Sequence, residues 1–299
     1  DGLLSNTEDK IYTFVLAGEM HFVSENGEQV ILHQCKIHLR PGSVRCLDDY
    51  FVMLEGLSDP EAAGTGIQFT SIVGLGRAAL TGCGLGGIFA AHFLWFCMNI
   101  LHDDGSIKCM WSLYMCALCF YHMSEFVVTM RYNSSIASCK SFLLDQSREY
   151  QIAMVASWLE FWLQAFLFPW LKVSFLSKCI VVLGVCIMFV GQYFRTGAMI
   201  CAGSNFSHII QFRKADKHQL VTTGLYSVSR HPSYFGWFWW SIGTQLLLCN
   251  PICTVGFAAA AYKFFSDRIP VEEKALVKFF PTEYPAYRAR TPVGIPFIS

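Results

Sequence analysis

Long apolar runs constrain the fold of this chain more than any other feature. Four runs are close to the roughly 20 residues that a helix needs to cross the core of a bilayer. They cover residues 78–101, 109–130, 150–171 and 175–199. A fifth apolar region, 234–265, is interrupted by Asn250 and Pro251. We expect its two short arms, 234–249 and 252–265, to form a helical hairpin, because Pro251 removes a backbone donor and ends the first arm.

The scarcity of charge agrees with a membrane protein. Charged residues make up 15% of the chain, against about a quarter in soluble domains. This composition argues against a disordered chain, a coiled coil and a soluble nucleic-acid binder with a basic face. The sequence therefore predicts an all-α polytopic membrane protein with four full spans and a C-terminal helical hairpin.

Lysine and arginine counts in the connecting loops predict the orientation of the spans. Residues 102–108 contain one such residue, 131–148 three, 195–233 five and 263–299 six. The loops alternate between poor and rich, so we expect the rich loops and the N-terminus on the cytosolic side. Most of the polar residues that could take part in binding or catalysis then lie on that side.

The N-terminal part differs from the rest. Residues 1–77 hold 11 acidic and 5 basic residues. Segments 11–15, 29–33 and 51–54 have the pattern of short strands, and residues 25–28 resemble a hairpin turn. We therefore divide the chain into an acidic segment, 1–65, without evident chemistry, a transmembrane bundle, 66–201, and a C-terminal part, 202–299, that carries the hairpin and the candidate site.

Two local motifs are interpreted as structural. Residues 82–87 match G-x-G-x-x-G, but they lie within an apolar run, so we expect Gly82 and Gly86 to allow close helix packing instead. Cys116 and Cys119 form a C-x-x-C without a second ligand pair, so no metal site is predicted.

Glu125 is an acid within a predicted span, where an ionisable group is a candidate for function. His122 precedes it by three residues and shares its helical face. We expect a structural hydrogen-bonded pair between the two, while a role for Glu125 in substrate passage stays open.

Chemically versatile side chains concentrate from residue 203 onward, on both sides of the predicted hairpin. Arg230-His231-Pro232 precedes the first arm, and Pro232 suits the first turn of a helix, whose free N–H groups favour an anion. Arg268 and Glu272 follow the second arm four residues apart, on one helix face. The hairpin would bring these two groups together at the cytosolic surface, although a surface ion pair is the simpler interpretation of Arg268 and Glu272.

The motifs of this part resemble the protein-S-isoprenylcysteine O-methyltransferase family. They are GSNFSHIIQ, TTGLYSVSRHPSYFGWFWWSIGTQLLLCNPIC, FFSDR followed by EE, and EYPAYRARTPVGIPFI. The resemblance runs back more loosely to Arg77 and covers about three quarters of the chain. It implies a multi-pass enzyme of the endoplasmic reticulum membrane that methylates the C-terminal prenylcysteine of CaaX proteins of the small-GTPase type.

The resemblance also implies S-adenosylmethionine as cofactor, in a non-Rossmann pocket on the cytosolic side. Arg268 would be the catalytic and substrate-binding residue. The cofactor-binding residues carried over by motif are Gln211, His218, Gln219, Leu220, Val221, Tyr226, His231, Pro232, Ser233, Tyr234 and Glu272. Within this set we expect backbone groups of 218–221 to meet adenine, the first turn at 231–234 to meet the methionine carboxylate, and Glu272 to meet the amino group.

Two alternatives stay open. The family usually has eight spans, two of them before the region of Arg77, whereas residues 1–65 contain no strong span. The chain could therefore be a catalytically impaired membrane scaffold. A sterol-reductase-like enzyme that uses NADPH would need further basic residues for the 2′-phosphate and about twice as many spans.

Overall fold

The computed structural model describes residues 12–23, 29–39, 72–100, 106–214 and 218–298. The chain divides into two compact units, residues 1–65 and 66–299. In the first unit, β1 (Tyr12–Val23) pairs antiparallel with β2 (Gln29–Leu39), with an irregular register between Leu16 and Glu19. These strands are longer than the segments expected from the sequence. The expected strand at 51–54 and the turn at 25–28 lie outside the described residues.

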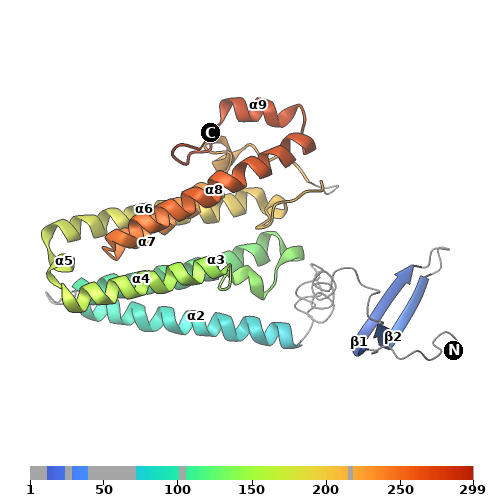
Figure 1. Cartoon of the computed structure of the whole chain (residues 1–299), viewed down its shortest axis with the longest axis horizontal. Coiled ribbons are helices and arrows are strands. Elements are labelled where there is room, and N and C mark those ends of the chain that lie inside the picture. Colours follow the sequence, from blue (N-terminus) through green and yellow to red (C-terminus); the bar gives the residue numbers. More distant parts are fainter. Residues whose placement is uncertain (1–11, 24–28, 40–71, 101–105, 215–217, 299) are drawn as a thin grey trace. The chain divides into compact units, whose positions relative to one another are not determined.

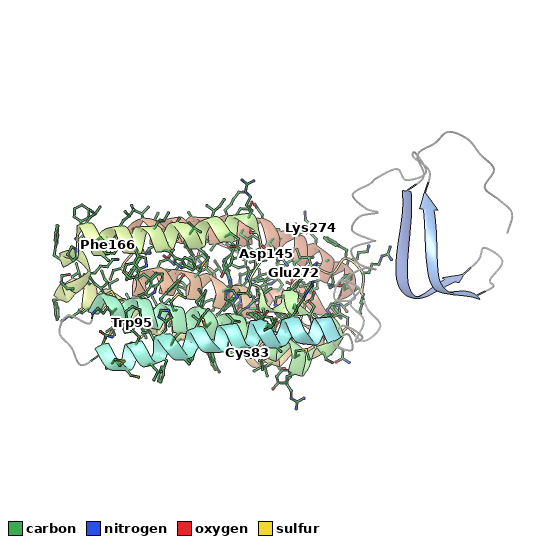
Figure 2. All side chains as sticks on the ribbon, turned by 90° about the horizontal axis from the view of Figure 1, so that it is seen from below. Cys83, Trp95, Asp145, Phe166, Glu272 and Lys274 are labelled. Atoms are coloured by element: carbon green, nitrogen blue, oxygen red, sulfur yellow. The ribbon has the colours of Figure 1, made fainter. Side chains whose placement is uncertain are left out.

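The second unit is a bundle of long helices that run along one another (Figure 1). Its helices are α2 (Ile72–Asn99), α3 (Ser106–Tyr132), α4 (Arg148–Leu167), α5 (Trp170–Val173), α6 (Phe175–Ala202), α7 (Pro232–Leu247), α8 (Pro251–Phe279) and α9 (Glu283–Arg290). Phe166, near the end of α4, and Glu272, on α8, lie toward opposite ends of the bundle (Figure 2).

Three helices of the described residues are long and apolar enough to cross a membrane, not the four full spans expected. They cover Gly76–Asn99, Ile107–Tyr132 and Phe175–Asn205. The expected span at 150–171 falls on α4, a 20-residue helix that ends at Leu167. Gln151, Glu160 and Gln164 lower its hydropathy. Glu160 is buried, and α4 ends where Phe168 and Pro169 lead into α5.

The closest helix packing joins α6 to α7, not α2 to its neighbours as the sequence suggested. A Cβ atom at Gly191 would collide with the backbone of Trp240, and one at Gly236 would collide with the backbone of Arg195. On α2, a Cβ at Gly82 would make only an ordinary contact 3.5 Å from Met123, and one at Gly86 would meet nothing within 4 Å. Glycine on both facing helices lets the α6 and α7 backbones approach each other without intervening side chains.

Two buried charged side chains from other helices bind the backbone at the turn between α7 and α8. The ammonium group of Lys172 on α5 donates to the carbonyls of Leu248 (2.7 Å) and Cys249 (3.3 Å), just beyond the end of α7. The carboxylate of Glu160 accepts from the backbone N–H groups of Ile252 (2.9 Å) and Cys253 (2.7 Å), at the start of α8. Charges of these signs at these helix ends satisfy free backbone groups and oppose the helix dipoles.

Pro251 has a different role from the one expected. It is the first residue of α8, and α7 already ends at Leu247. A proline at this position loses no helical hydrogen bond. The second arm also extends further than expected, because α8 continues for 29 residues to Phe279. Arg268 and Glu272 therefore lie on the same helix as the apolar arm.

Candidate functional site

A cavity of about 120 Å³ lies where the segment after α6 meets the start of α7 and the C-terminal half of α8. The eleven residues that the sequence predicted for cofactor binding all line it: Gln211, His218, Gln219, Leu220, Val221, Tyr226, His231, Pro232, Ser233, Tyr234 and Glu272. Aromatic side chains that the sequence did not assign to cofactor binding complete the wall: Phe206, Phe279, Tyr284 and Tyr287. We call this space the polar cavity.

Local hydrogen bonds fix the segment that forms one wall of the polar cavity. The backbone N–H of Gln219 donates to Oδ1 of Asn205 at 2.8 Å. The ring of His218 packs edge-on against Phe279 and Phe280, with centroids 5.8 and 5.5 Å away. Burial, and to a lesser degree the charge of Lys214, lower the pKa of His218, so its ring is neutral at physiological pH.

Glu272 and Glu273 are adjacent on α8, but they have different surroundings. Glu272 faces the polar cavity and accepts a hydrogen bond from the hydroxyl of Tyr234 at 2.5 Å. Glu273 is buried, accepts a hydrogen bond from Nε of Arg230 at 2.5 Å and forms an ion pair with Nε of Arg288 at 3.2 Å. Glu272 thus presents a carboxylate to a ligand, while Glu273 joins α8 to the residues before α7 and to α9.

The segment after α9 is attached to the residues that precede α7. The guanidinium of Arg230 donates to the carbonyl of Thr291 at 2.7 Å, and its backbone N–H donates to the carbonyl of Pro292 at 2.9 Å. The hydroxyl of Ser229 donates to the carbonyl of Val293 at 2.6 Å. These bonds hold Arg230, His231 and the first turn of α7 at the wall of the polar cavity.

A second, mostly apolar cavity of about 830 Å³ lies beside the first, and Arg268 lines it rather than the polar cavity. Its walls come from α3, the N-terminal half of α4, and the facing sides of α7 and α8. The lining residues of α8 are Ile252, Cys253, Gly256, Phe257, Ala260, Ala261, Phe264, Phe265 and Arg268. We call this space the apolar cavity. Its shape and lining suit a chain of hydrocarbon with a polar group at the Arg268 end.

Tyr234 stands between the two cavities and lines both. Its hydroxyl donates to Glu272 and accepts from Nε of Arg268 at 2.9 Å. Nη2 of Arg268 also donates to the carbonyl of His208 at 2.6 Å. The acidic group of the polar cavity and the basic group of the apolar cavity are therefore joined through one phenol.

Glu125 is part of a buried network, but His122 is not its partner as the sequence suggested. Glu125 accepts from Arg195 at 2.6 and 2.9 Å and contacts Nε2 of His208 at 2.9 Å. His122 instead contacts the carbonyl of Phe142 at 2.8 Å and the hydroxyl of Tyr150 at 3.2 Å. The histidine on the same helix face was the wrong choice, because the guanidinium of Arg195 reaches Glu125 from α6.

Arg195 links that network to the first turn of α7. Its Nη1 donates to the hydroxyl of Ser233 at 2.7 Å, while its other nitrogens hold Glu125. His208 completes the connection, since its ring contacts Glu125 and its carbonyl accepts from Arg268. Arg195, His208 and Glu273 were not predicted as site residues from the sequence. Arg195 stood out as an arginine near the end of an apolar run, and His208 and Glu273 lie in two of the family motifs.

Comparison with known proteins gives a consistent result. Residues 182–278 match the model of the isoprenylcysteine carboxyl methyltransferase family. The chain is 45% identical over 223 residues to protein-S-isoprenylcysteine O-methyltransferase of Homo sapiens, covering 74% of this chain and 75% of that protein. The protein of the same name from Xenopus laevis is 49% identical over 186 residues, which are 62% of this chain and 63% of the relative.

A solved structure of the eukaryotic intramembrane Ras methyltransferase, isoprenylcysteine carboxyl methyltransferase, is similar over most of its length. The two superpose with a TM-score of 0.71 at 32% sequence identity, covering 86% of this chain and 88% of that chain. The agreement between sequence and fold therefore extends beyond the C-terminal motifs.

Proposed function

Because the chain belongs to the isoprenylcysteine carboxyl methyltransferase family, we propose that it methylates the C-terminal carboxylate of prenylated cysteine. The methyl donor is S-adenosylmethionine, and the substrates are CaaX-processed proteins of the small-GTPase type. The reaction takes place at the cytosolic face of the endoplasmic reticulum membrane. The distribution of lysine and arginine among the loops supports that orientation.

The observation that carries this proposal is the meeting of a polar and an apolar cavity at Tyr234. A prenylcysteine has a long hydrocarbon chain and a carboxylate, and the methyl donor is a polar, charged molecule. Two adjoining cavities of unlike character, with Arg268 on one side of the shared residue and Glu272 on the other, suit these two ligands.

The residues of the polar cavity fit S-adenosylmethionine, which supplies an electrophilic methyl group when bound. Glu272 offers a carboxylate for an ammonium group, and Tyr226, Phe279 and Tyr287 offer aromatic faces that attract cations. Pro232 and Ser233 lie in the first turn of α7, and the positive end of a helix dipole favours a carboxylate. Backbone groups of residues 218–221 would meet the adenine.

Arg268 would orient the substrate carboxylate. The hydroxyl of Tyr234 and the carbonyl of His208 each occupy one of its donors. A guanidinium has five N–H donors, so others remain for a carboxylate. A C-terminal carboxyl group is ionised at neutral pH, so the enzyme needs no general base. The chain then contributes positioning and the removal of water from two opposite charges.

The proposal is tested by transfer of labelled methyl from S-adenosylmethionine to N-acetyl-S-farnesylcysteine, in membranes that carry the full chain. We expect a base-labile methyl ester, and a fall of about thirtyfold or more in Arg268→Ala, because a truncated charge partner costs about 2–5 kcal/mol. Lys263→Ala is the matched control, since this exposed lysine pairs with Asp267 on the same helix.

An assay of S-adenosylmethionine binding distinguishes an impaired scaffold from a wrong proposal. If inserted chain binds labelled S-adenosylmethionine but transfers no methyl group, the impaired scaffold is the better description. If it neither binds the donor nor transfers the methyl group, the proposal is wrong.

A further inference from the structure

We propose that Gly256 sets the length of prenyl chain that the apolar cavity accepts. This inference rests on the proposed function, because it takes the occupant of the apolar cavity to be the prenyl group of the substrate. It concerns a specificity-determining position that faces the hydrocarbon end of the substrate, far from the reacting atoms.

Gly256 lies in the row of α8 residues that lines the apolar cavity. A Cβ atom added there would meet no other atom within 4 Å. The neighbouring space is therefore open, unlike the space at Gly191 and Gly236, where the facing backbone is in contact. A larger side chain at position 256 fits the fold and takes its volume from the cavity.

The far end of the apolar cavity has a fixed wall. The carboxylate of Glu160 ties α4 to the backbone of Ile252 and Cys253, which line the cavity at that end. Tyr114 from α3 also lines it, and its hydroxyl accepts from the indole of Trp158 at 3.0 Å. These hydrogen bonds hold both groups in place at that end of the cavity.

Distances along α8 match the lengths of the two common prenyl groups. At 1.5 Å per residue, Gly256 lies about 18 Å from Arg268, and Ile252 lies about 24 Å from it. An extended isoprene unit spans about 5 Å, as do the bonds from the cysteine carboxyl carbon to the prenyl group, so farnesylcysteine is about 20 Å long. Geranylgeranylcysteine has one more isoprene unit and reaches about 25 Å.

These lengths place the end of a farnesyl chain near Gly256 and the end of a geranylgeranyl chain near Ile252. Only the tip of the shorter chain reaches Gly256, whereas the whole last isoprene unit of the longer chain lies beyond it. A larger side chain at position 256 therefore obstructs the longer chain far more than the shorter one.

The test compares the kcat/KM for N-acetyl-S-farnesylcysteine with that for N-acetyl-S-geranylgeranylcysteine, in membranes carrying the full chain. In Gly256→Leu we expect the geranylgeranyl value to fall about tenfold or more, because a misfit of even one methylene in an apolar pocket costs 10–200-fold. The farnesyl value should stay within about threefold of the parent.

Two other leucine substitutions on α8 serve as a positive and a negative control. Ala260 lines the apolar cavity about 12 Å from Arg268, so Ala260→Leu should lower the values for both substrates. Ala259 is exposed and is not among the residues that line the cavity, so Ala259→Leu should change neither. Equal effects of Gly256→Leu on both substrates, or no effect on either, would overturn the inference.

Two further variants decide the question if Gly256→Leu does not insert into membranes. Gly256→Ala and Ile252→Trp, the latter at the far end, should each lower the ratio of geranylgeranyl to farnesyl kcat/KM. A ratio unchanged in both would reject the inference. A parent chain that methylates neither substrate would instead reject the proposed function, so the two failures are distinguishable.

Discussion

Arg195 carries a charge near the end of a mostly apolar helix, and its guanidinium makes three hydrogen bonds to two partners. Two guanidinium nitrogens hold Glu125, and the third reaches Ser233 in the first turn of α7. Both charged side chains are almost fully buried. Such a pair contributes little net stability, but it is costly to break because one charge is left without a partner.

We expect Arg195→Met to lower the free energy of unfolding by about 3–5 kcal/mol, since it strands Glu125. The double variant Glu125→Leu/Arg195→Met should recover much of that loss, because no buried charge remains. Methyl transfer should stay low in both, since Ser233 and His208 lose the groups that hold them. Thermal denaturation in detergent and the methyl-transfer assay measure the two effects. Full activity in the double variant would show that the pair acts on stability alone.

The pKa of Glu273 predicts how the stability of the folded protein depends on pH. Burial raises the pKa of Glu273, but hydrogen bonds and charges from His231 and Arg230 outweigh it and hold the pKa at about 2. A carboxyl group whose pKa is depressed by folding stabilises the protein above its unfolded pKa of about 4.3. This contribution is lost as the pH falls through the folded pKa.

We therefore expect the melting temperature to fall between about pH 4.5 and 2, and the fall to be smaller in Glu273→Gln. At about 1.4 kcal/mol per pKa unit, the contribution is on the order of 3 kcal/mol. Melting curves in detergent across this range measure it. Glu283→Gln, on the exposed side of α9, is the control and should follow the parent. A parent-like slope in Glu273→Gln would exclude this carboxylate as the source.

At the scale of elements, the contact between α6 and α7 positions the site. Gly191 and Gly236 let the backbones touch, and Arg195 reaches Ser233 one turn away from that contact. We expect Gly191→Ala to push the helices apart, lowering the free energy of unfolding by about 1–3 kcal/mol and reducing methyl transfer. Gly84→Ala, on α2 where a Cβ meets nothing within 4 Å, is the matched control. Equal activity of both variants would contradict a positioning role for this contact.

The hydrophobic pattern and the position of Pro251 predicted the hairpin, because both signals lie within a single segment of the sequence. The same reasoning gave the wrong partner for Glu125. Helical spacing ranks His122 first, whereas Arg195 and His208 are 70 and 83 residues away in sequence. The span expected at 150–171 stays a prediction: α4 is not among the three candidate spans, and the sequence did not reveal that Glu160 within it holds the start of α8.

At the scale of the whole molecule, the family motifs identified the residues of the polar cavity better than any local rule. The eleven residues carried over by motif come from the loop after α6, from the start of α7 and from α8, and they line one cavity. Composition and spacing did not link these segments. Arg268 also could not be assigned to the second cavity from sequence, since the boundary between the cavities depends on where the ring of Tyr234 lies.

The bonds between the residues before α7 and the segment after α9 bear on the order of assembly during synthesis. Ser229 and Arg230 find their partners 61 to 64 residues later in the chain. A ribosome therefore completes both arms of the hairpin before Thr291, Pro292 and Val293 exist to hold the entry of α7. The wall of the polar cavity at the start of α7 is therefore completed only once the segment after α9 has been synthesised.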